Sequence, residues 1–151
     1  MFIDIVSYGG NLLLIVNLDG KGDLPEILEN RLNDIGRWLK VNGEGIYNSR
    51  PYKVQTENYV SYTQSKDGQF IYAVIKEWPG HEMFLKNVSA KDGSKIKMLG
   101  YDKPIEWINT NKGLSIKFPE KLQNEKDRPC EYAWILRIEG SDNQNNQNQY
   151  Q

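Results

Sequence analysis

Five consecutive aliphatic residues near the start of the chain, Leu-Leu-Leu-Ile-Val at positions 12–16, constrain the fold more than any other feature. A strand with one face in water alternates apolar and polar residues, and this run does not alternate. It therefore predicts a strand that is covered on both faces, as in a parallel sheet flanked by helices. Five such side chains left in water would forgo roughly 1.5 to 3 kcal/mol each, or about 10 kcal/mol together. We expect the strand to pack beneath its own helix and onto the rest of the chain, or to pair with a second copy.

A helix is expected after this strand and a polar loop at 17–23. Asp23 is a candidate N-cap, and Pro25 suits the first helical turn. Gly36 costs about 1 kcal/mol relative to alanine inside a helix, which predicts a close packing contact there. Gly43 is expected to end the helix in the left-handed conformation. Apolar residues line one face of the predicted helix at Leu24, Leu28, Leu32, Ile35 and Leu39, widened by Ile27 and Trp38.

From about residue 52 the period of the apolar pattern changes from 3.6 to 2, which indicates strands. Turn signals such as Lys66-Asp67-Gly68, Pro79-Gly80, Asp92-Gly93 and Asn111-Lys112-Gly113 separate the runs. Seven strands are predicted, at 59–63, 70–78, 83–88, 95–99, 105–108, 114–118 and 132–138. The pattern predicts a mainly β fold: an antiparallel β-sandwich of about seven or eight strands, preceded by one βα unit.

The composition excludes several classes of function. With 19 basic and 20 acidic residues, the chain lacks the excess positive charge that nucleic-acid binding requires. A single cysteine, Cys130, and a single histidine, His81, provide neither an intrachain disulfide nor a zinc cluster. No run approaches the roughly 18 apolar residues of a membrane span, and the first residues lack the basic region of a signal peptide. We expect no cofactor, no nucleic acid and no membrane, and the cellular compartment stays unknown.

Candidate chemical groups are few. Two acidic pairs lie close in sequence, Glu77 with Glu82 and Asp19 with Asp23, and we interpret both as solvated turn charges. His81 follows a turn without a second ligand or a serine partner, and Cys130 is interpreted as a packing residue. The loop DGKGD at 19–23 has neither a complete phosphate-binding motif nor a full set of calcium ligands. No catalytic, binding or metal residue is therefore assigned.

Aromatic residues support one alternative. Sugar-binding sandwiches can use exposed aromatic rings as platforms for the apolar faces of sugars. Trp78, next to a Pro-Gly turn, and Trp107, in a short strand, are the candidate platforms, although packing is the favoured interpretation for both. Trp134 is in phase with Tyr132 and Leu136 and is expected in the core.

The sequence motifs in the first third of the chain resemble those of a known family. The matching motifs are Gly10-Asn11-Leu12-Leu13-Leu14, Asp19-Gly20, Trp38-Leu39, Asn42-Gly43-Glu44, Ile46-Tyr47 and Arg50-Pro51. They resemble the last barrel strand, last barrel helix and exit segment of the retaining α-L-fucosidases, a family of glycoside hydrolases. Tyr59 with Tyr62, Ile71-Tyr72-Ala73 and Tyr132-Ala133-Trp134 resemble its C-terminal β-sandwich. Ile15 and Ser49 depart from the family pattern.

The resemblance implies that most of a catalytic (β/α)8 barrel, typically about 250 residues, is not in this sequence. It assigns 1–51 to a barrel remnant, 52–139 to the sandwich and 140–151 to a disordered Asn/Gln-rich tail. A retaining glycosidase needs two carboxyl groups about 5 to 5.5 Å apart, and in this family both lie upstream of the GGNLLL strand. The resemblance therefore implies a non-catalytic C-terminal part, inactive alone, whose partner is the missing barrel or a second copy of the chain. An independent module that binds fucosylated glycans is the alternative, and a self-sufficient enzyme is a third, weaker hypothesis. Complete relatives are often periplasmic, secreted or lysosomal.

Overall fold

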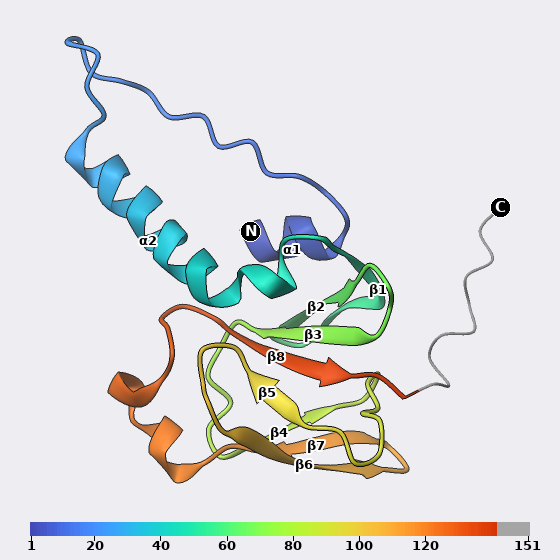
Figure 1. Ribbon diagram of the computed structural model, residues 1–151. Helices are drawn as coiled ribbons and strands as arrows, with labels where there is room; N and C mark the ends of the chain where they lie inside the picture. Colours follow the sequence, from blue (N-terminus) through green and yellow to red (C-terminus); the bar gives the residue numbers. More distant parts are fainter. Residues whose placement is uncertain (142–151) are drawn as a thin grey trace, which may run out of the picture.

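The computed structural model describes residues 1–141 and consists of two helices packed on a β-sandwich (Figure 1). Helix α1 covers Phe2–Ser7 and helix α2 covers Glu26–Asn42, followed by the short 3₁₀ helix η1 at Gly43–Gly45. None of the helices in this part of the chain is long and apolar enough to cross a membrane. Positions 142–151 of the predicted tail lie outside the described residues, whereas Gly140 is paired with Ala90 in an isolated β-bridge.

Eight antiparallel strands follow the helices, and they confirm the predicted sandwich. Their order in the sheet is β1-β2-β3-β8-β5-β6-β7-β4. The strands are β1 Ser49–Glu57, β2 Val60–Ser65, β3 Phe70–Ile75, β4 Glu82–Leu85, β5 Ile96–Met98, β6 Pro104–Thr110, β7 Gly113–Lys117 and β8 Trp134–Glu139. The loop between β7 and β8 contains the 3₁₀ helices η2 (Glu120–Gln123) and η3 (Glu125–Asp127).

The sheet bends at β6, and the bend produces the two layers. Pro104 and Ile105 of β6 pair with β5, whereas Glu106–Thr110 pair with β7. Strands β6, β7 and β4 thereby lie against the layer of β1, β2, β3 and β8 (Figure 1). The core between the layers contains Tyr62 and Ile75 from one layer and Leu85 and Leu114 from the other, all at most 1% exposed.

Strands β3 and β8 are buried on both faces. Ile71, Ala73 and Ile75 of β3 face the sandwich core, whereas Tyr72 and Val74 belong to a second apolar cluster that packs under the helices. The same division holds in β8, where Leu136 and Ile138 face the core and Ile135 faces the helices. Unbroken apolar runs are therefore found where a sheet is covered on both sides, as the physical rule requires.

The run at 12–16 does not follow that rule in this structure, and our prediction of a strand packed beneath its own helix and onto the sandwich was wrong. Pairing with a second copy, the alternative to that packing, stays a prediction. Residues 11–19 form no strand, and Leu13 and Ile15 are 83% and 79% exposed. The segment arcs away from the sandwich between α1 and α2 (Figure 1). A strand needs neighbours for its backbone hydrogen bonds, and the described residues place none beside this segment.

The ends of α2 also differ from the prediction. Pro25, not Asp23, occupies the N-cap position, and no side chain caps this end. Gly43 is right-handed, with φ −57°, because the chain continues directly into η1 instead of reversing. A Cβ at Gly36 would meet nothing within 4 Å, so the predicted close contact is absent there.

Helix α1, strand β1 and the three short 3₁₀ helices were not predicted. Helix α1 is short, and strand β1 begins at the exit motif Arg50-Pro51, where proline obscures the strand pattern. β1 is an edge strand, the position that tolerates proline, and its register with β2 shifts between Pro51 and Thr56. Tyr132 is 67% exposed and precedes the strand with φ 71°, whereas Trp134 is in the core as predicted.

Candidate functional site

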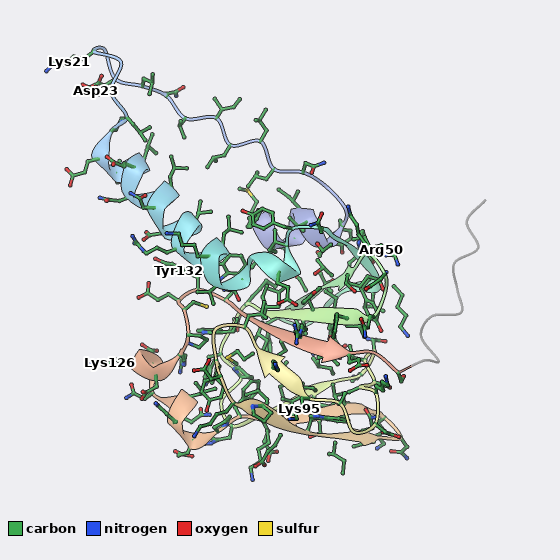
Figure 2. All side chains as sticks on the ribbon, viewed as in Figure 1. Lys21, Asp23, Arg50, Lys95, Lys126 and Tyr132 are labelled. Carbon is green, nitrogen blue, oxygen red and sulfur yellow. The ribbon has the colours of Figure 1, made fainter. Side chains whose placement is uncertain are left out.

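Several strongly exposed apolar side chains lie in the segment before α2 and on α2 itself. We call the surface that they form the open apolar face, and it consists of Leu13, Leu14, Ile15, Leu18, Ile27 and Ile35. Figure 2 shows Lys21 and Asp23 at the tip of the connection, far from the sandwich. Exposed apolar side chains in such number are typical of interaction sites in soluble proteins. The open apolar face is therefore the main candidate for contact with another polypeptide.

One end of α2 is fixed to the sandwich by Trp38. This side chain is 8% exposed, and its Nε1 donates a hydrogen bond to the carbonyl of Ala133 at 2.8 Å. The ring of Phe2 from α1 meets Trp38 edge to face, with 6.4 Å between centroids. At the end of α2, Asn42 donates to the sulfur of Cys130 at 3.3 Å. The C-terminal half of α2 is thus held rigidly, while its N-terminal half projects.

Helix α1 is fixed to the other half of the sheet by Asp4. The Oδ1 atom accepts hydrogen bonds from Lys76 Nζ at 2.8 Å and from Ser61 Oγ at 3.0 Å. The hydrogen bond from Lys76 is the largest of the causes that hold the pKa of Asp4 well below its usual range. Asp4 and Trp38 thus attach the segment that precedes the sandwich to the sandwich at two points.

The tryptophans that we considered as sugar platforms are engaged in packing. The ring of Trp78 lies 5.0 Å from that of Trp134 and 5.2 Å from that of Phe118, and the Arg128 guanidinium lies 4.3 Å above it. Its Nε1 donates to Gln123 Oε1 at 3.1 Å. Trp107 is partly buried and packs against the sandwich core. The contacts of Trp78 leave its ring no open face of the kind that sugar stacking uses, and packing is the observed role of Trp107.

The remaining candidate groups do not assemble into a reactive site. Asp19 accepts hydrogen bonds from the backbone of Asp23 at 2.9 Å and Lys21 at 2.8 Å, which lower its pKa, so it shapes the turn. His81 is exposed and lies 3.4 Å from Glu120. Glu77 and Glu82 are exposed. Burial raises the pKa of the Cys130 thiol, which donates to the Ala133 carbonyl. Within residues 1–141 no group of three or more His, Cys, Asp or Glu is arranged to hold a metal ion.

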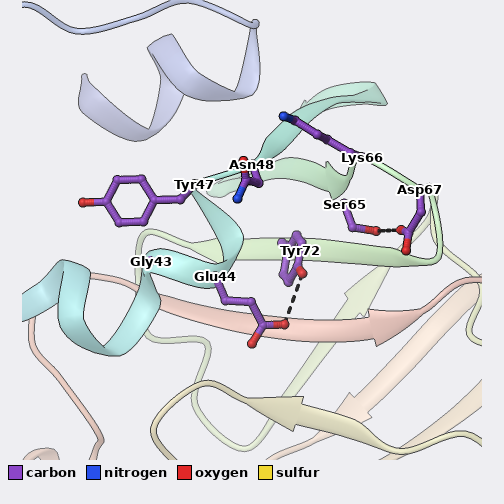
Figure 3. Close-up of a pocket in the computed structure, with 8 residues that line it drawn as sticks. All are labelled: Gly43, Glu44, Tyr47, Asn48, Ser65, Lys66, Asp67 and Tyr72. Atoms are coloured by element: carbon purple, nitrogen blue, oxygen red, sulfur yellow. Dashed lines mark hydrogen bonds between the residues drawn. The ribbon is translucent and has the colours of Figure 1, made fainter.

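A separate hollow of about 470 Å³ lies where η1 and the following linker meet the β2–β3 turn (Figure 3). Glu44 and Tyr72 line one side, with the Tyr72 hydroxyl donating to Glu44 Oε1 at 3.1 Å. Arg137 donates to the same oxygen at 3.1 Å. Burial and the neighbouring carboxylate of Glu44 raise the pKa of Tyr72 to about 12. The other lining residues are Gly43, Tyr47, Asn48, Ser65, Lys66 and Asp67.

Sequence reasoning missed this hollow because its residues come from two segments about twenty positions apart, joined only in the folded chain. One signal was available in Gly43, where a Cβ would lie 2.9 Å from two ring carbons of Tyr47. The glycine thus lets the tyrosine ring fold back onto the helix end.

Comparison with known proteins places these features in a family. Residues 53–139 match the model described as the alpha-L-fucosidase C-terminal domain, and residues 1–44 match the model described as alpha-L-fucosidase. The chain belongs to the α-L-fucosidase family. The resemblance proposed from the motifs is therefore confirmed, and the boundary between the two matches coincides with the linker that follows α2.

Individual relatives agree with this assignment. The tissue alpha-L-fucosidase of Bos taurus is 37% identical over 142 residues, and the alpha-L-fucosidase of Branchiostoma floridae is 32% identical over 142 residues. The matches cover 91% of this chain but only 30% and 31% of those relatives. The alpha-fucosidase of Thermotoga maritima in complex with fucose superimposes with a TM-score of 0.73 at 26% identity, over 90% of this chain and 32% of that one. The chain thus spans about a third of the length of the relatives it matches.

Proposed function

We propose that this chain acts as the non-catalytic C-terminal part of an α-L-fucosidase, supporting a barrel that hydrolyses α-L-fucosides. The observation that carries the proposal is the contrast between the two parts of the chain. The sandwich, which matches the C-terminal domain model, has a closed core with Tyr62 and Leu136 fully buried. The segment that matches the enzyme model leaves Leu13 and Ile15 in water.

The open apolar face supports a barrel as the partner. In a (β/α)8 barrel each strand is flanked by two parallel strands and covered by helices, so an apolar run without alternation is what the last strand requires. Residues 12–18 are extended and have unpaired backbone groups that neighbouring strands could pair. Helix α1 directly precedes this run, as a barrel helix precedes a strand, and α2 directly follows it.

The chemistry of hydrolysis would reside in the barrel. A retaining mechanism needs two carboxyl groups held about 5 to 5.5 Å apart in a shielded site. Among residues 1–141, the carboxylates of Asp4 and Glu57 make structural hydrogen bonds. Asp4 anchors α1, and Glu57 accepts from Tyr62, Asn87 and the backbone of Lys86. The function left to this chain is to hold the barrel's last helix, α2, through Trp38 and the start of the chain, α1, through Asp4.

A chimera tests the proposal. The C-terminal third of the Thermotoga maritima enzyme is replaced by this chain, and release of nitrophenol from 4-nitrophenyl α-L-fucoside is measured. We expect hydrolysis by the chimera, none by the chain alone, and loss of activity on changing Leu13→Asp together with Ile15→Asp. Lys21→Asp, at the tip of the connection, is the matched control and should leave activity unchanged. An inactive chimera, a chimera that tolerates both aspartates, or hydrolysis by the isolated chain would contradict the proposal.

The alternative occupant of the open apolar face is another copy of the chain. Light scattering over a range of concentrations distinguishes a barrel from a second copy as the occupant. Self-association that persists in the chimera would favour the second copy, whereas association confined to the isolated chain would favour the barrel.

A further inference from the structure

The hollow beside η1 combines an open aromatic ring with unpaired polar groups. Tyr47 is 60% exposed, with one side of its ring against Gly43. The side chains of Tyr47, Asn48 and Lys66 make no hydrogen bond to any other residue among positions 1–141, and Glu44 accepts its bonds on Oε1 alone. Donors and acceptors that point into a hollow without partners are available to a ligand.

Hydrogen bonds organise the framework of the hollow. Glu44 Oε1 accepts from Tyr72 and from Arg137, each at 3.1 Å, which leaves the second oxygen, Oε2, without a partner among residues 1–141. On the opposite side Asp67 accepts from the Ser65 hydroxyl and from the backbone of Gln69, which fixes the β2–β3 turn. Asn48 has φ 56°, a conformation that asparagine tolerates better than most residues. Preorganised groups lose little conformational entropy when a ligand binds.

The charges around the hollow select the class of ligand. Each of the two carboxylates has a cation beside it: Arg137 pairs with Glu44 at 3.1 Å, and Arg50 is near enough to act electrostatically on Asp67. Carboxylates that already have a cation beside them attract a metal ion only weakly, and Lys66, the one cation among the lining residues, is exposed to solvent. The hollow therefore suits a neutral ligand that has many hydroxyl groups and one apolar face, and a sugar ring combines these properties. The volume of about 470 Å³ is within the range of small-molecule sites.

We propose that the hollow formed by Glu44, Tyr47, Asn48, Lys66 and Asp67 binds a neutral saccharide, whose ring contacts Tyr47 and whose hydroxyls bond Asn48 and the free oxygen of Glu44. The lining residues of this site come from η1, the linker and the β2–β3 turn, so it is separate from the open apolar face. It also places sugar recognition on a different surface from Trp78 and Trp107, whose rings are packed. The saccharide site would lie at the joint between the helices and the sandwich.

Amide chemical shifts of the ¹⁵N-labelled 151-residue chain test the site. The probes are methyl α-L-fucoside and methyl β-D-galactoside, with glycerol and inorganic phosphate as non-saccharide probes. We expect at least one glycoside to move the amides of 43–48 and 65–67 in a saturable manner, with a Kd on the order of 1 mM. Absence of a response to either glycoside, or an equal response to glycerol or phosphate, would overturn the proposal.

Variants separate the site from a general effect on folding. Tyr47→Ala should weaken binding about tenfold or more, a change of about 1.4 kcal/mol. Asn48→Gly removes the amide group and suits the positive φ at this position, so it tests the site without the risk of unfolding. Tyr8→Ala, at a tyrosine that is 65% exposed outside the hollow, is the matched control. Binding that survives both Tyr47→Ala and Asn48→Gly, or that is lost in Trp107→Phe, would contradict this location.

Discussion

Replacing the two most exposed aliphatic residues of the 12–16 run tests whether that run contributes to the stability of the chain. In the structure Leu13 is 83% exposed and Ile15 is 79% exposed. Surface substitutions of this kind change the free energy of unfolding by about 0.5 kcal/mol or less each. We therefore expect the double variant Leu13→Ser and Ile15→Ser to lose less than about 1 kcal/mol.

A run packed under its helix, as the sequence pattern alone predicts, would give a different result. Truncating buried leucine or isoleucine costs about 2 to 5 kcal/mol per site, and so the pair would lose about 4 to 10 kcal/mol. That loss is as large as the whole stability of many domains. The two expected losses in the free energy of unfolding differ severalfold, and this difference is larger than the experimental error.

Urea unfolding followed by tryptophan fluorescence measures the difference, at a concentration where light scattering shows monomers. Leu136→Ala is the matched control, because Leu136 is fully buried in β8 and should lose about 2 to 5 kcal/mol. A loss above about 3 kcal/mol in the double variant, with an unchanged slope against urea, would refute the open apolar face. The same serines introduced into the chimera should impair it, because the barrel would bury both positions.

Three further predictions follow from single contacts. Trp38→Phe removes the indole hydrogen bond and should cost about 1 kcal/mol in urea unfolding, whereas Trp38→Ala should cost about 3 to 5 kcal/mol. Because the pKa of Asp4 is lowered in the folded chain, its pairing with Lys76 stabilises the fold above about pH 4, the usual pKa of an aspartate, and this stabilisation is lost as the pH falls further. The melting temperature of the chain should therefore decline below about pH 4, and Asp4→Asn should remove the part of this decline that Asp4 causes. A carboxylate this exposed contributes at most about 1 kcal/mol. Gly113→Ala should lower the melting temperature by more than 5 °C, roughly the effect of 1 kcal/mol or more, because its Cβ would lie 2.3 Å from the carbonyl oxygen of Leu85 and φ is 140°.

Much of the sandwich could be predicted from the sequence because its signals are local. Short apolar runs between turn signals located seven of the eight strands, and glycines in the turns, such as Gly68 at φ 76°, have a left-handed backbone. Strand β1 escaped detection because the Arg50-Pro51 motif interrupts its pattern. The family motifs include Trp38 and Asn42 near the end of α2, and both residues are buried there.

The candidate sites depend on contacts that no local pattern encodes. Asp4 and Lys76 are separated by 72 positions, and Trp38 and the Ala133 carbonyl by 95. The hollow around Tyr47 and Asp67 exists only because η1 packs beside the β2–β3 turn. Pairings over such distances are decided by the complete arrangement of the sheet and helices.

The sequence by itself determined which segments are apolar enough to need cover, and the tertiary structure decided which of them receive it. The run at 70–75 and the run at 12–16 look alike as sequences, and both lack alternation. The first is strand β3, covered by the sandwich core on one face and by the helices on the other. The second pairs with no strand among residues 1–141 and stays mostly exposed. Hydrophobicity is a property of the side chain, but burial is a property of everything placed around it.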